Sequence, residues 1–418
     1  MKPANCCRHY VELHFPSQST STILHMSFLG PRTNVPLSIS SSARPRLACQ
    51  VLCCGRQTVR PKLQFQSVRP IRHFSGTSST FDKMRCILIK DGKGPAENLY
   101  LGEEETPLPK QGEVQVKIKT FGLNRMDLLQ REGQYPLPPQ ASKTIMGVEF
   151  AGVVTKLGEG ASKFKEGDEV FGLAFGGAYA EYIISPEQML LHKPKSLGWA
   201  EAGGIPENWM TAYQALFLEG GLQKGQNVLI HAGASGVGVA AIQLALHVGQ
   251  ANKVFTTCGT DEKVEFLKRL GGGDERLIPI NYRTQQFEEE IKKHEDGVDL
   301  IVDFIGKNYF TPNLNSLRRD GTLVFLAMMS GPKLPADTNI IQILFKRLTL
   351  KGSTLRSRTT EYQADLLQRF EKHALGLITE GKMKVEIHEV FPWDKVIEAQ
   401  KEMEANKNSG KIVFEIPE

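Results

Sequence analysis

The sequence predicts an α/β protein in which a doubly wound parallel sheet is inserted into a β-rich domain. Three observations lead to this prediction. Residues 84–206 contain short strands with frequent glycine turns, residues 228–350 alternate between apolar strands and helices, and a last strand ends at Phe414. Strands that alternate with helices form parallel sheets, because each connecting helix packs on a face of the sheet. We expect the tail to rejoin the first domain.

The β-rich domain is expected to begin with a strand at residues 86–90. Residues 113–120 alternate between apolar and polar side chains, as a half-buried strand does. Residues 121–127 leave that strand and start a short helix, and the proline-rich loop 133–139 presents the hydroxyl of Tyr135. Further strands are expected at residues 147–154 and 165–172, followed by a helix at 206–218.

The alternating part of the chain supplies the parallel sheet. Its predicted strands are 228–230, 254–257, 278–280, 300–304, 322–327 and 348–350, and its helices include 261–270 and 287–294. A long helix at 361–379 and a closing pair of strands follow. The predicted domains are 84–206 together with 356–418, and 207–355.

A glycine-rich turn joins the first strand of the alternating part to an apolar helix. Residues 231–238 read His-Ala-Gly-Ala-Ser-Gly-Val-Gly, and residues 239–248 form the helix. Gly233 allows a tight turn, and Gly238 lets the helix pack close to the strand. Backbone N–H groups at a helix N-terminus bind anions such as a pyrophosphate. The turn therefore predicts a dinucleotide site, with Ser235 in place of the second glycine of the usual G-x-G-x-x-G pattern.

The end of the next strand indicates which dinucleotide binds. A site for NADH favours Asp or Glu there, because a carboxylate holds the ribose 2′-hydroxyl. Residues 258–260 instead read Cys-Gly-Thr, and Lys263 follows shortly after. A hydroxyl and an ammonium suit a 2′-phosphate, so this strand end favours NADPH. The negative charges of Asp261 and Glu262, which lie close by, count against a phosphate here.

Charge and cysteine usage limit the function classes. Residues 1–80 hold ten Lys or Arg residues and one acid, Glu12, so the remaining 41 basic and 45 acidic residues give the body a net charge of −4. A mildly acidic body does not suggest nucleic-acid binding. Five of the seven cysteines lie in residues 1–80, which leaves Cys86 and Cys258 in the body and excludes a disulfide framework there.

Residues 1–80 have the composition of a mitochondrial transit peptide, because they are rich in Ser and Arg and poor in acids. Arg72-His73-Phe74-Ser75 resembles a mitochondrial processing site, with cleavage expected near Phe74 and Ser75. The sequence therefore predicts import into the mitochondrial matrix. Two alternatives stay open: a disordered tail, or a misassigned start with translation from Met84, which would leave the enzyme in the cytoplasm.

Several stretches of residues 84–418 carry a resemblance to one family. They read Leu-Asn-Arg-Met-Asp at 123–127, Gly-Gln-Tyr at 133–135, Ile-Pro-Glu-Asn-Trp-Met-Thr-Ala at 205–212, the turn at 231–238, and Glu-Ala-Asn-Lys-Asn-Ser-Gly-Lys-Ile-Val at 404–413. The chain thus resembles the zinc-independent quinone oxidoreductases, which include zeta-crystallin, within the medium-chain dehydrogenase/reductase superfamily. Within that branch it resembles the apoptosis-linked, NADPH-dependent subgroup. The resemblance implies a Rossmann domain inserted in a GroES-like catalytic domain.

The same resemblance implies that no metal is bound. The zinc-dependent relatives carry Cys where Asn124 stands and Gly-His-Glu where residues 147–149 read Gly-Val-Glu. The chain also has no Cys between Cys86 and Cys258, so a four-cysteine zinc lobe has no ligands there.

The resemblance further implies a role for each site residue. Asn124 and Tyr135 would be catalytic and face the substrate. Cofactor-binding residues would be Ser235, Gly236, Val237 and Gly238 at the pyrophosphate, Gly259, Thr260 and Lys263 at the 2′-phosphate, Tyr282 at the adenosine, and Thr211, Ile305, Gly306, Ala327, Met328 and Met329 at the nicotinamide. Candidates to stabilise an oxyanion are Arg125, Arg356 and Arg358, each otherwise expected at a solvated surface.

The implied function is an NADPH-dependent quinone oxidoreductase that transfers hydride to a quinone or similar conjugated carbonyl, and the implied assembly is a homodimer. A quinone accepts hydride readily and mainly needs to be held against the nicotinamide. Two alternatives stay open, a mitochondrial 2-enoyl thioester reductase and a non-enzymatic NADPH-binding or redox-sensing protein. Neither a nucleic-acid partner nor a membrane span is expected.

Overall fold

The computed structural model describes residues 82–417. The transit-like segment and its expected cleavage near Phe74 lie outside the described residues. Within them, no helix is both long enough and apolar enough to cross a membrane.

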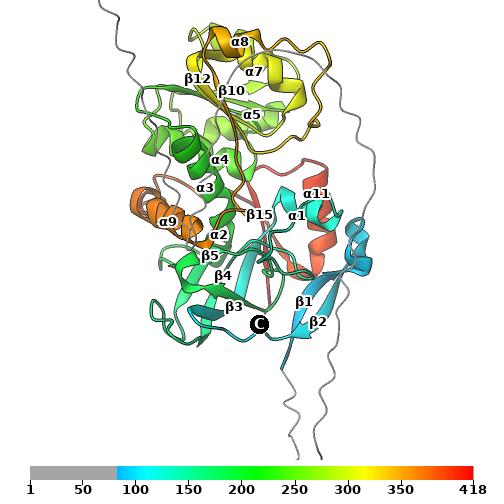
Figure 1. Ribbon diagram of the computed structural model, residues 1–418. Coiled ribbons are helices and arrows are strands. Elements are labelled where there is room, and N and C mark those ends of the chain that lie inside the picture. Colours follow the sequence, from blue (N-terminus) through cyan, green and yellow to red (C-terminus); the bar gives the residue numbers. More distant parts are fainter. Residues whose placement is uncertain (1–81, 418) are drawn as a thin grey trace, which may run out of the picture. The chain divides into compact units, whose positions relative to one another are not determined.

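The first part of the chain and the tail build one seven-stranded sheet, at the lower end of the molecule in Figure 1. Its strand order is β14-β15-β3-β4-β5-β7, and β6 pairs with β3. The strands are β3 (Glu113–Gly122), β4 (Glu149–Leu157), β5 (Glu169–Leu173), β6 (Tyr182–Pro186), β7 (Leu190–His192), β14 (Ile387–Pro392) and β15 (Lys411–Glu415). The pairing of β15 with β3 confirms that the tail rejoins the first domain. A separate hairpin consists of β1 (Lys83–Ile89) and β2 (Leu99–Glu105).

The middle of the chain builds a six-stranded parallel sheet with the order β10-β9-β8-β11-β12-β13. The strands are β8 (Asn227–Ile230), β9 (Lys253–Cys258), β10 (Leu277–Asn281), β11 (Val298–Asp303), β12 (Leu317–Phe325) and β13 (Thr349–Gly352). The order runs outward in both directions from β8 and β11, which confirms the predicted doubly wound sheet. Ligands of such sheets bind at the carboxyl ends of the strands beside this reversal.

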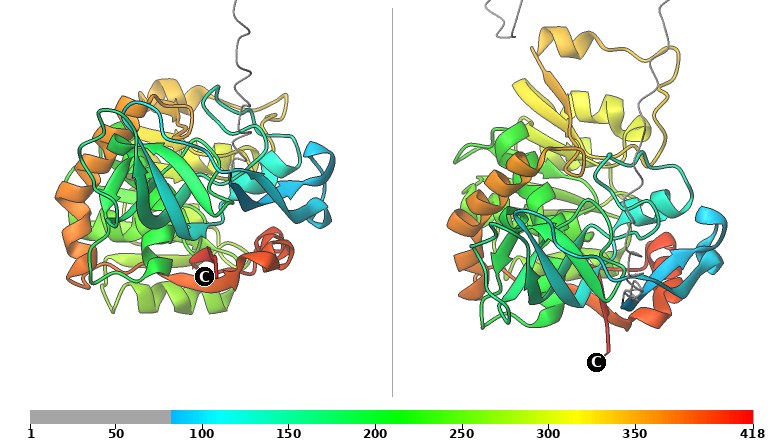
Figure 2. Two further views of the ribbon diagram at one scale, coloured as in Figure 1. Left: turned by 90° about the horizontal axis from the view of Figure 1, so that it is seen from below. Right: turned by 60° about the horizontal axis from the view of Figure 1, so that its bottom comes forward.

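The helices follow the predicted alternation. Those near the seven-stranded sheet are α1 (Arg125–Arg131), α2 (Trp199–Gly204), α3 (Pro206–Tyr213), α9 (Thr360–Phe370), α10 (Gly376–Thr379) and α11 (Val396–Glu404); those of the parallel part are α4 (Gly236–Gln243), α5 (Asp261–Leu270), α6 (Phe287–Lys292), α7 (Phe310–Ser316) and α8 (Ile341–Phe345). The predicted helix at 206–218 continues past α3 as a π-helical turn, Gln214–Glu219. Figure 2 shows α9, in orange, running along the outside of the green strands.

One apolar core joins the two sheets. It contains Phe171 from β5, Trp209 from α3, Val228 from β8 and Phe370 from α9, all at most 2% exposed. The rings of Trp209 and Phe370 lie with their centroids 6.1 Å apart. Burying such side chains stabilises the fold by roughly 25 cal/mol per Å² of apolar surface. Helix α3 therefore has a fixed position relative to both sheets.

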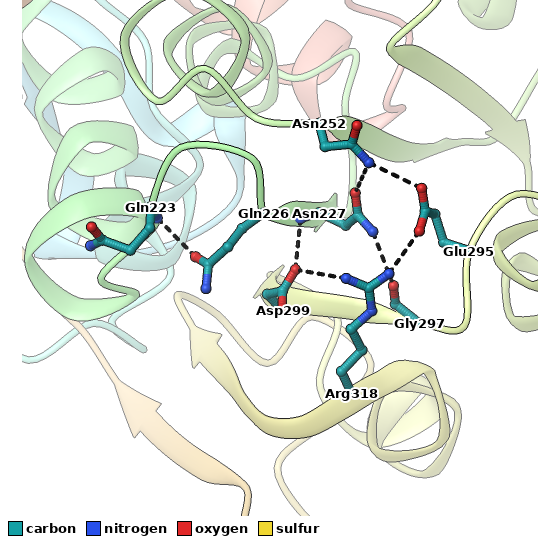
Figure 3. Close-up of polar contacts among 8 residues, drawn as sticks. All are labelled: Gln223, Gln226, Asn227, Asn252, Glu295, Gly297, Asp299 and Arg318. Carbon is teal, nitrogen blue, oxygen red and sulfur yellow. Dashed lines mark hydrogen bonds and ion pairs between the residues drawn. The ribbon is translucent and has the colours of Figure 1, made fainter.

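A polar network holds the amino ends of the parallel strands together (Figure 3). The Asn227 backbone N–H donates to Asp299 Oδ2 at 2.7 Å, and Arg318 contacts both Asp299 and Glu295. Asn252 completes the network with hydrogen bonds to Asn227 and Glu295. The carboxyl ends of these strands, where doubly wound sheets bind their ligands, lie at the opposite edge of the sheet.

Candidate functional site

The glycine-rich turn lies between β8 and α4, as predicted. Ser235 caps α4, because its Oγ accepts a hydrogen bond from the Gly238 N–H at 3.1 Å. A Cβ atom on Gly233 would lie 1.9 Å from Thr256 Oγ1, and one on Gly238 would lie 2.4 Å from the Ala232 carbonyl oxygen. Neither position accepts a side chain, so the backbone packs as closely as a pyrophosphate-binding turn requires.

Two other segments contact this turn. A Cβ atom on Gly236 would lie 2.0 Å from Asn208 Nδ2, so α3 reaches the start of α4. The Gly410 N–H donates to the Ala234 carbonyl at 2.8 Å. The turn from the parallel sheet therefore meets the segment that leads into β15.

The predicted 2′-phosphate end lies at the N-terminus of α5. Thr260 caps this helix through Lys263 N–H at 3.3 Å. The Lys263 ammonium donates to the Asn406 carbonyl at 2.7 Å, and Arg125 donates to Asn406 Oδ1 at 2.6 Å. Burial lowers the pKa of Lys263, and the charges of Arg125 and Arg283 lower it further. Three cationic side chains thus lie near one another, and Arg125 belongs to this end rather than to an oxyanion site.

Tyr282 lies over the start of the same loop. Its hydroxyl would be 2.5 Å from a Cβ atom on Gly259, and its side chain is 45% exposed. A side chain on Gly259 would therefore displace the tyrosine. An exposed ring at this edge has a free surface on which an adenosine can stack.

Two loops bring together four of the residues predicted at the nicotinamide, Ile305, Gly306, Met328 and Met329. Asp303 accepts hydrogen bonds from Ile305 N–H at 2.6 Å and Gly306 N–H at 3.1 Å. A Cβ atom on Gly306 would lie 2.6 Å from Met328 Sδ, and Met329 N–H donates to Phe304 at 3.1 Å. Ala327 precedes these methionines in the second loop, and Thr211 is partly exposed on α3.

A buried chain of side chains supports the first of these loops. His231 contacts Thr257 Oγ1 at 3.0 Å and Asn313 Oδ1 at 2.8 Å, and Asn313 Nδ2 donates to Asp303 Oδ2 at 3.1 Å. Burial lowers the pKa of His231 to about 4 and raises the pKa of Asp303 to about 6. The neutral imidazole therefore links the turn after β8 to the loop at Ile305. Sequence reasoning gave no role to His231, Asn313 or Asp303, because His231 meets the other two only in the folded sheet.

A second group, which we call the buried polar cluster, consists of Asn124, Asp127, Glu149, Glu207 and Lys411. The Lys411 ammonium lies 2.5 Å from Glu149 Oε1 and donates to Asn124 Oδ1 at 2.7 Å. Asn124 Nδ2 donates to Glu149 Oε1 at 2.7 Å, and the Glu207 backbone N–H donates to Glu149 Oε2 at 2.8 Å. Both ends of the Asn124 amide are therefore engaged, so this residue orients its neighbours rather than offering a free group to a substrate.

Asp127 and Glu207 are the carboxyl groups of the cluster whose pKa values are raised. Asp127 Oδ2 accepts hydrogen bonds from Asn124 N–H at 2.9 Å and Tyr179 OH at 3.1 Å. Burial raises the pKa of Asp127 to about 6. Burial, reinforced by the charge of Glu149, raises the pKa of Glu207 to about 8. Glu207 lies in one of the stretches that carry the family resemblance, but its neighbours in the sequence gave no sign that its side chain would be buried.

Tyr135 lies beside a buried guanidinium. Arg356 is 2% exposed, donates to Phe175 O and Gln130 Oε1 at 2.7 Å each, and lies 5.5 Å from the centroid of the Tyr135 ring. Its Nη2 has no hydrogen-bond partner among the described residues. The expectation of a solvated Arg356 was wrong, because the side chain is held by two acceptors. Burial raises the pKa of Tyr135, so the phenol stays neutral and its hydroxyl is available as a hydrogen-bond donor.

Arg358 takes no part in this site. It pairs with Glu219 at 2.6 Å and lies over the Tyr362 ring. Two cavities, of about 360 and 410 Å³, also lie elsewhere. The first is lined by residues 111–113, 186–188, 360 and 361, and the second by residues 217, 222–224, 248–250 and 373. Within residues 82–417, no group of three or more His, Cys, Asp and Glu side chains is arranged to hold a metal ion.

Comparison with known proteins identifies the same architecture. Family models described as "Alcohol dehydrogenase GroES-like domain" and "Zinc-binding dehydrogenase" match residues 110–195 and 236–372. A rat protein named "Synaptic vesicle membrane protein VAT-1 homolog" is 33% identical over 79% of this chain and 84% of its own length. The solved quinone oxidoreductase of Pseudomonas syringae is 27% identical, with a TM-score of 0.69 over 80% of this chain and all of its own. The solved CurK enoyl reductase is 28% identical, with a TM-score of 0.68 over 80% of this chain and 99% of its own.

Proposed function

We propose, on the premise that this chain belongs to the quinone oxidoreductase branch of the medium-chain dehydrogenase/reductase superfamily, that it transfers hydride from NADPH to a quinone or a similar conjugated carbonyl. Membership of this superfamily implies an oxidoreductase with a nicotinamide cofactor. What we propose beyond this membership is that the cofactor is NADPH and that the hydride acceptor is a quinone or a similar conjugated carbonyl.

The choice of NADPH rests chiefly on the charges at the end of β9. Lys263, Arg125 and Arg283 lie within electrostatic reach of one another there, and Cys258 stands where an NADH site favours a carboxylate. Glu404 also acts on Arg125, so the three cations are only partly balanced and suit a doubly charged phosphate. The close packing of Gly233 and Gly238 in turn fits the pyrophosphate of any dinucleotide.

The bound dinucleotide supplies the two electrons of the reaction as hydride. The residues of this chain hold and orient the acceptor: the paired loops at Ile305 and Met328 form one wall, and Tyr135 and Arg356 lie near the buried polar cluster. The unpartnered Arg356 Nη2 and the neutral Tyr135 hydroxyl are hydrogen-bond donors for a carbonyl oxygen. We propose that no zinc takes part, because Asn124 and Val148 occupy the positions of the zinc ligands.

A 2-enoyl thioester reductase is the second candidate, favoured by the similarity to the CurK enoyl reductase. The discriminating experiment measures NADPH oxidation with a panel of quinones and 2-enoyl thioesters. We expect higher kcat/KM with a quinone than with any thioester. The reverse order would favour the second candidate, and no oxidation with any acceptor would favour a non-enzymatic NADPH-binding or redox-sensing protein.

Two further proposals concern assembly and location. We propose a homodimer formed through α8 and the free edge of β13, because Leu344 and Phe345 are 70% and 62% exposed beside that edge strand. From the composition of residues 1–80 we propose import into the mitochondrial matrix. A fusion of residues 1–80 to a fluorescent protein is expected to enter mitochondria, and a cytosolic fusion would contradict the proposal.

A further inference from the structure

Glu207 is a largely buried residue, and no donor among the described residues binds its carboxyl group. The residue is 9% exposed, and none of the hydrogen bonds and ion pairs among the described residues involves its side-chain oxygens. Glu149 differs, because Lys411, Asn124 and the Glu207 backbone all bind it. Burying a carboxylate that nothing binds is unfavourable, so the neutral acid is the favoured form of Glu207.

The charges around Glu207 reinforce this preference. Glu149 from β4 and Asp127 from α1 oppose ionisation, whereas Lys411 from β15 and Arg356, which follows β13, favour it. Tyr135, from the loop after α1, also lies within reach of its charge. Lys411 is paired with Glu149, whereas Arg356 donates to the neutral oxygens of Phe175 and Gln130, so no ion pair among the described residues joins either cation to Glu207. Glu207 consequently has no counterion of its own.

The position of Glu207 on α3 directs it to the reacting region. It lies one helical turn before Thr211, and residues four apart share a helix face. Thr211 is the residue of α3 expected at the nicotinamide, while Asn208, on the adjacent position, reaches Gly236 in the pyrophosphate turn. The first turn of α3 therefore spans the distance between the cofactor turn and the buried polar cluster.

We propose that Glu207 is a catalytic residue, whose neutral carboxyl group hydrogen-bonds the acceptor oxygen and gives it the proton that accompanies hydride transfer. This inference rests on the proposed reduction of a conjugated carbonyl. A quinone that becomes a hydroquinone gains one hydride, which carries both electrons, and one proton. The O–H bond of Glu207 breaks as the O–H bond on the substrate forms, and water returns a proton to the carboxylate.

This assignment is chemically better than proton donation by Tyr135. Burial raises the pKa of that phenol above its already high ordinary value of 10, whereas Glu207 has a pKa of about 8. A general acid works best when its pKa lies near the working pH. Tyr135 and Arg356 then hold the oxygen, and Glu207 supplies the proton.

The test compares Glu207→Gln with Glu207→Asp and with the control Glu361→Gln. Glu361 is likewise the second residue of a helix, α9, but is exposed. General acids contribute about 10²- to 10⁴-fold, so we expect Glu207→Gln to lower kcat on the order of 10²-fold with little change in KM. Wild-type kcat should fall above pH 8, whereas the Gln variant should lack this decline. Glu207→Asp should regain part of kcat, and Glu361→Gln should match the wild type.

A second readout needs no cofactor. Carbon-13 NMR of glutamate carboxyl carbons in the cofactor-free protein should show one group that titrates near pH 8, absent from Glu207→Gln and present in Glu361→Gln. If every glutamate of the wild type titrates in the ordinary range, the inference is wrong. Normal quinone reduction by Glu207→Gln would also reject it while leaving the proposed function intact. Failure of the wild type to oxidise NADPH with any acceptor would instead reject the proposed function, and the inference with it.

Discussion

The Lys411 ammonium lies 2.5 Å from the Glu149 carboxylate, and the two side chains are only 4% and 0% exposed. The residue before Lys411, Gly410, donates to the Ala234 carbonyl in the glycine-rich turn. One short segment thus joins the buried polar cluster to the predicted cofactor site. Removal of the charge of Lys411 or of Glu149 should therefore lower the stability of the fold and also disturb the predicted cofactor site.

Lys411→Ala should lower the free energy of unfolding by about 3–5 kcal/mol, because it leaves Glu149 buried without its cation. The Lys411→Met/Glu149→Gln double variant should recover part of this loss, since no lone charge remains. Urea unfolding gives the free energies. Arg347→Ala, which breaks the exposed pair with Asp320, is the control and should cost far less, because solvent screens that pair. Equal losses for Lys411→Ala and Arg347→Ala would contradict the account.

The pH dependence of stability should carry a contribution from His231. Its pKa is about 4 in the folded protein against 6.5 in the unfolded chain, so between these values the unfolded chain binds more protons. Stability is therefore complete above pH 6.5 and is lost as pH falls towards 4, by on the order of 3 kcal/mol. Asp127 and Asp303, with pKa values raised to about 6, act in the opposite sense.

The variant His231→Asn isolates this contribution. Its stability should fall less steeply than that of the wild type as pH decreases, because asparagine does not titrate. Urea unfolding between pH 7.5 and pH 4.5 measures both slopes. Parallel slopes would show that His231 does not stay neutral in the folded protein.

The chain should hold no stoichiometric zinc. Zinc sites need thiolate, imidazole or carboxylate ligands, whereas Asn124 has both ends of its amide bound and Val148 has no ligand atom. Elemental analysis of the purified protein and an activity assay after chelator treatment check this expectation. One zinc per chain, together with loss of activity on chelation, would refute it.

Much of the fold was predictable because it depends on local patterns. The alternation of strands and helices predicted every strand of the parallel sheet, and the bounds of α5 matched residue for residue. The glycine-rich turn was predictable too, since Gly233 and Gly238 stand where no side chain fits. By contrast, the predicted domain bounds remain a prediction.

The buried polar groups were not predictable from the sequence. Glutamate, lysine and aspartate side chains are usually exposed. Lys411 meets Glu149 and Asn124 from a distant segment of the chain. Asp303 is bound by residues close to it in the sequence, but its burial, like that of Glu207, depends on the folded sheets around it. Arg356 illustrates the error that follows, because an arginine in a polar loop suggests a solvated surface. Roles that depend on a neighbour more than a hundred residues away need the folded structure.

The proposed dimer makes Leu344 a sensitive position. Leu344→Glu should convert the dimer to a monomer, because it places a charge in an apolar interface beside the edge strand β13. The control is Val390→Glu, on the exposed part of β14. Light scattering coupled to size exclusion measures the mass of both. A wild type that is already monomeric, or a Leu344→Glu protein that stays dimeric, would overturn the proposed interface.

Cofactor choice gives the sharpest test of the proposed function. The two cofactors differ only at the 2′-phosphate, and a charge-assisted hydrogen bond to it contributes roughly 1.5–3 kcal/mol. Lys263→Ala should therefore lower kcat/KM for NADPH on the order of tenfold and leave NADH nearly unchanged. The control variant Lys268→Ala removes a lysine of the same helix that forms only an exposed pair with Glu265. It should change kcat/KM for neither cofactor. Steady-state kinetics at fixed quinone concentration and low salt should show that the wild type prefers NADPH and that the Lys263→Ala variant has lost this preference. A wild type that prefers NADH would contradict the proposed choice of cofactor.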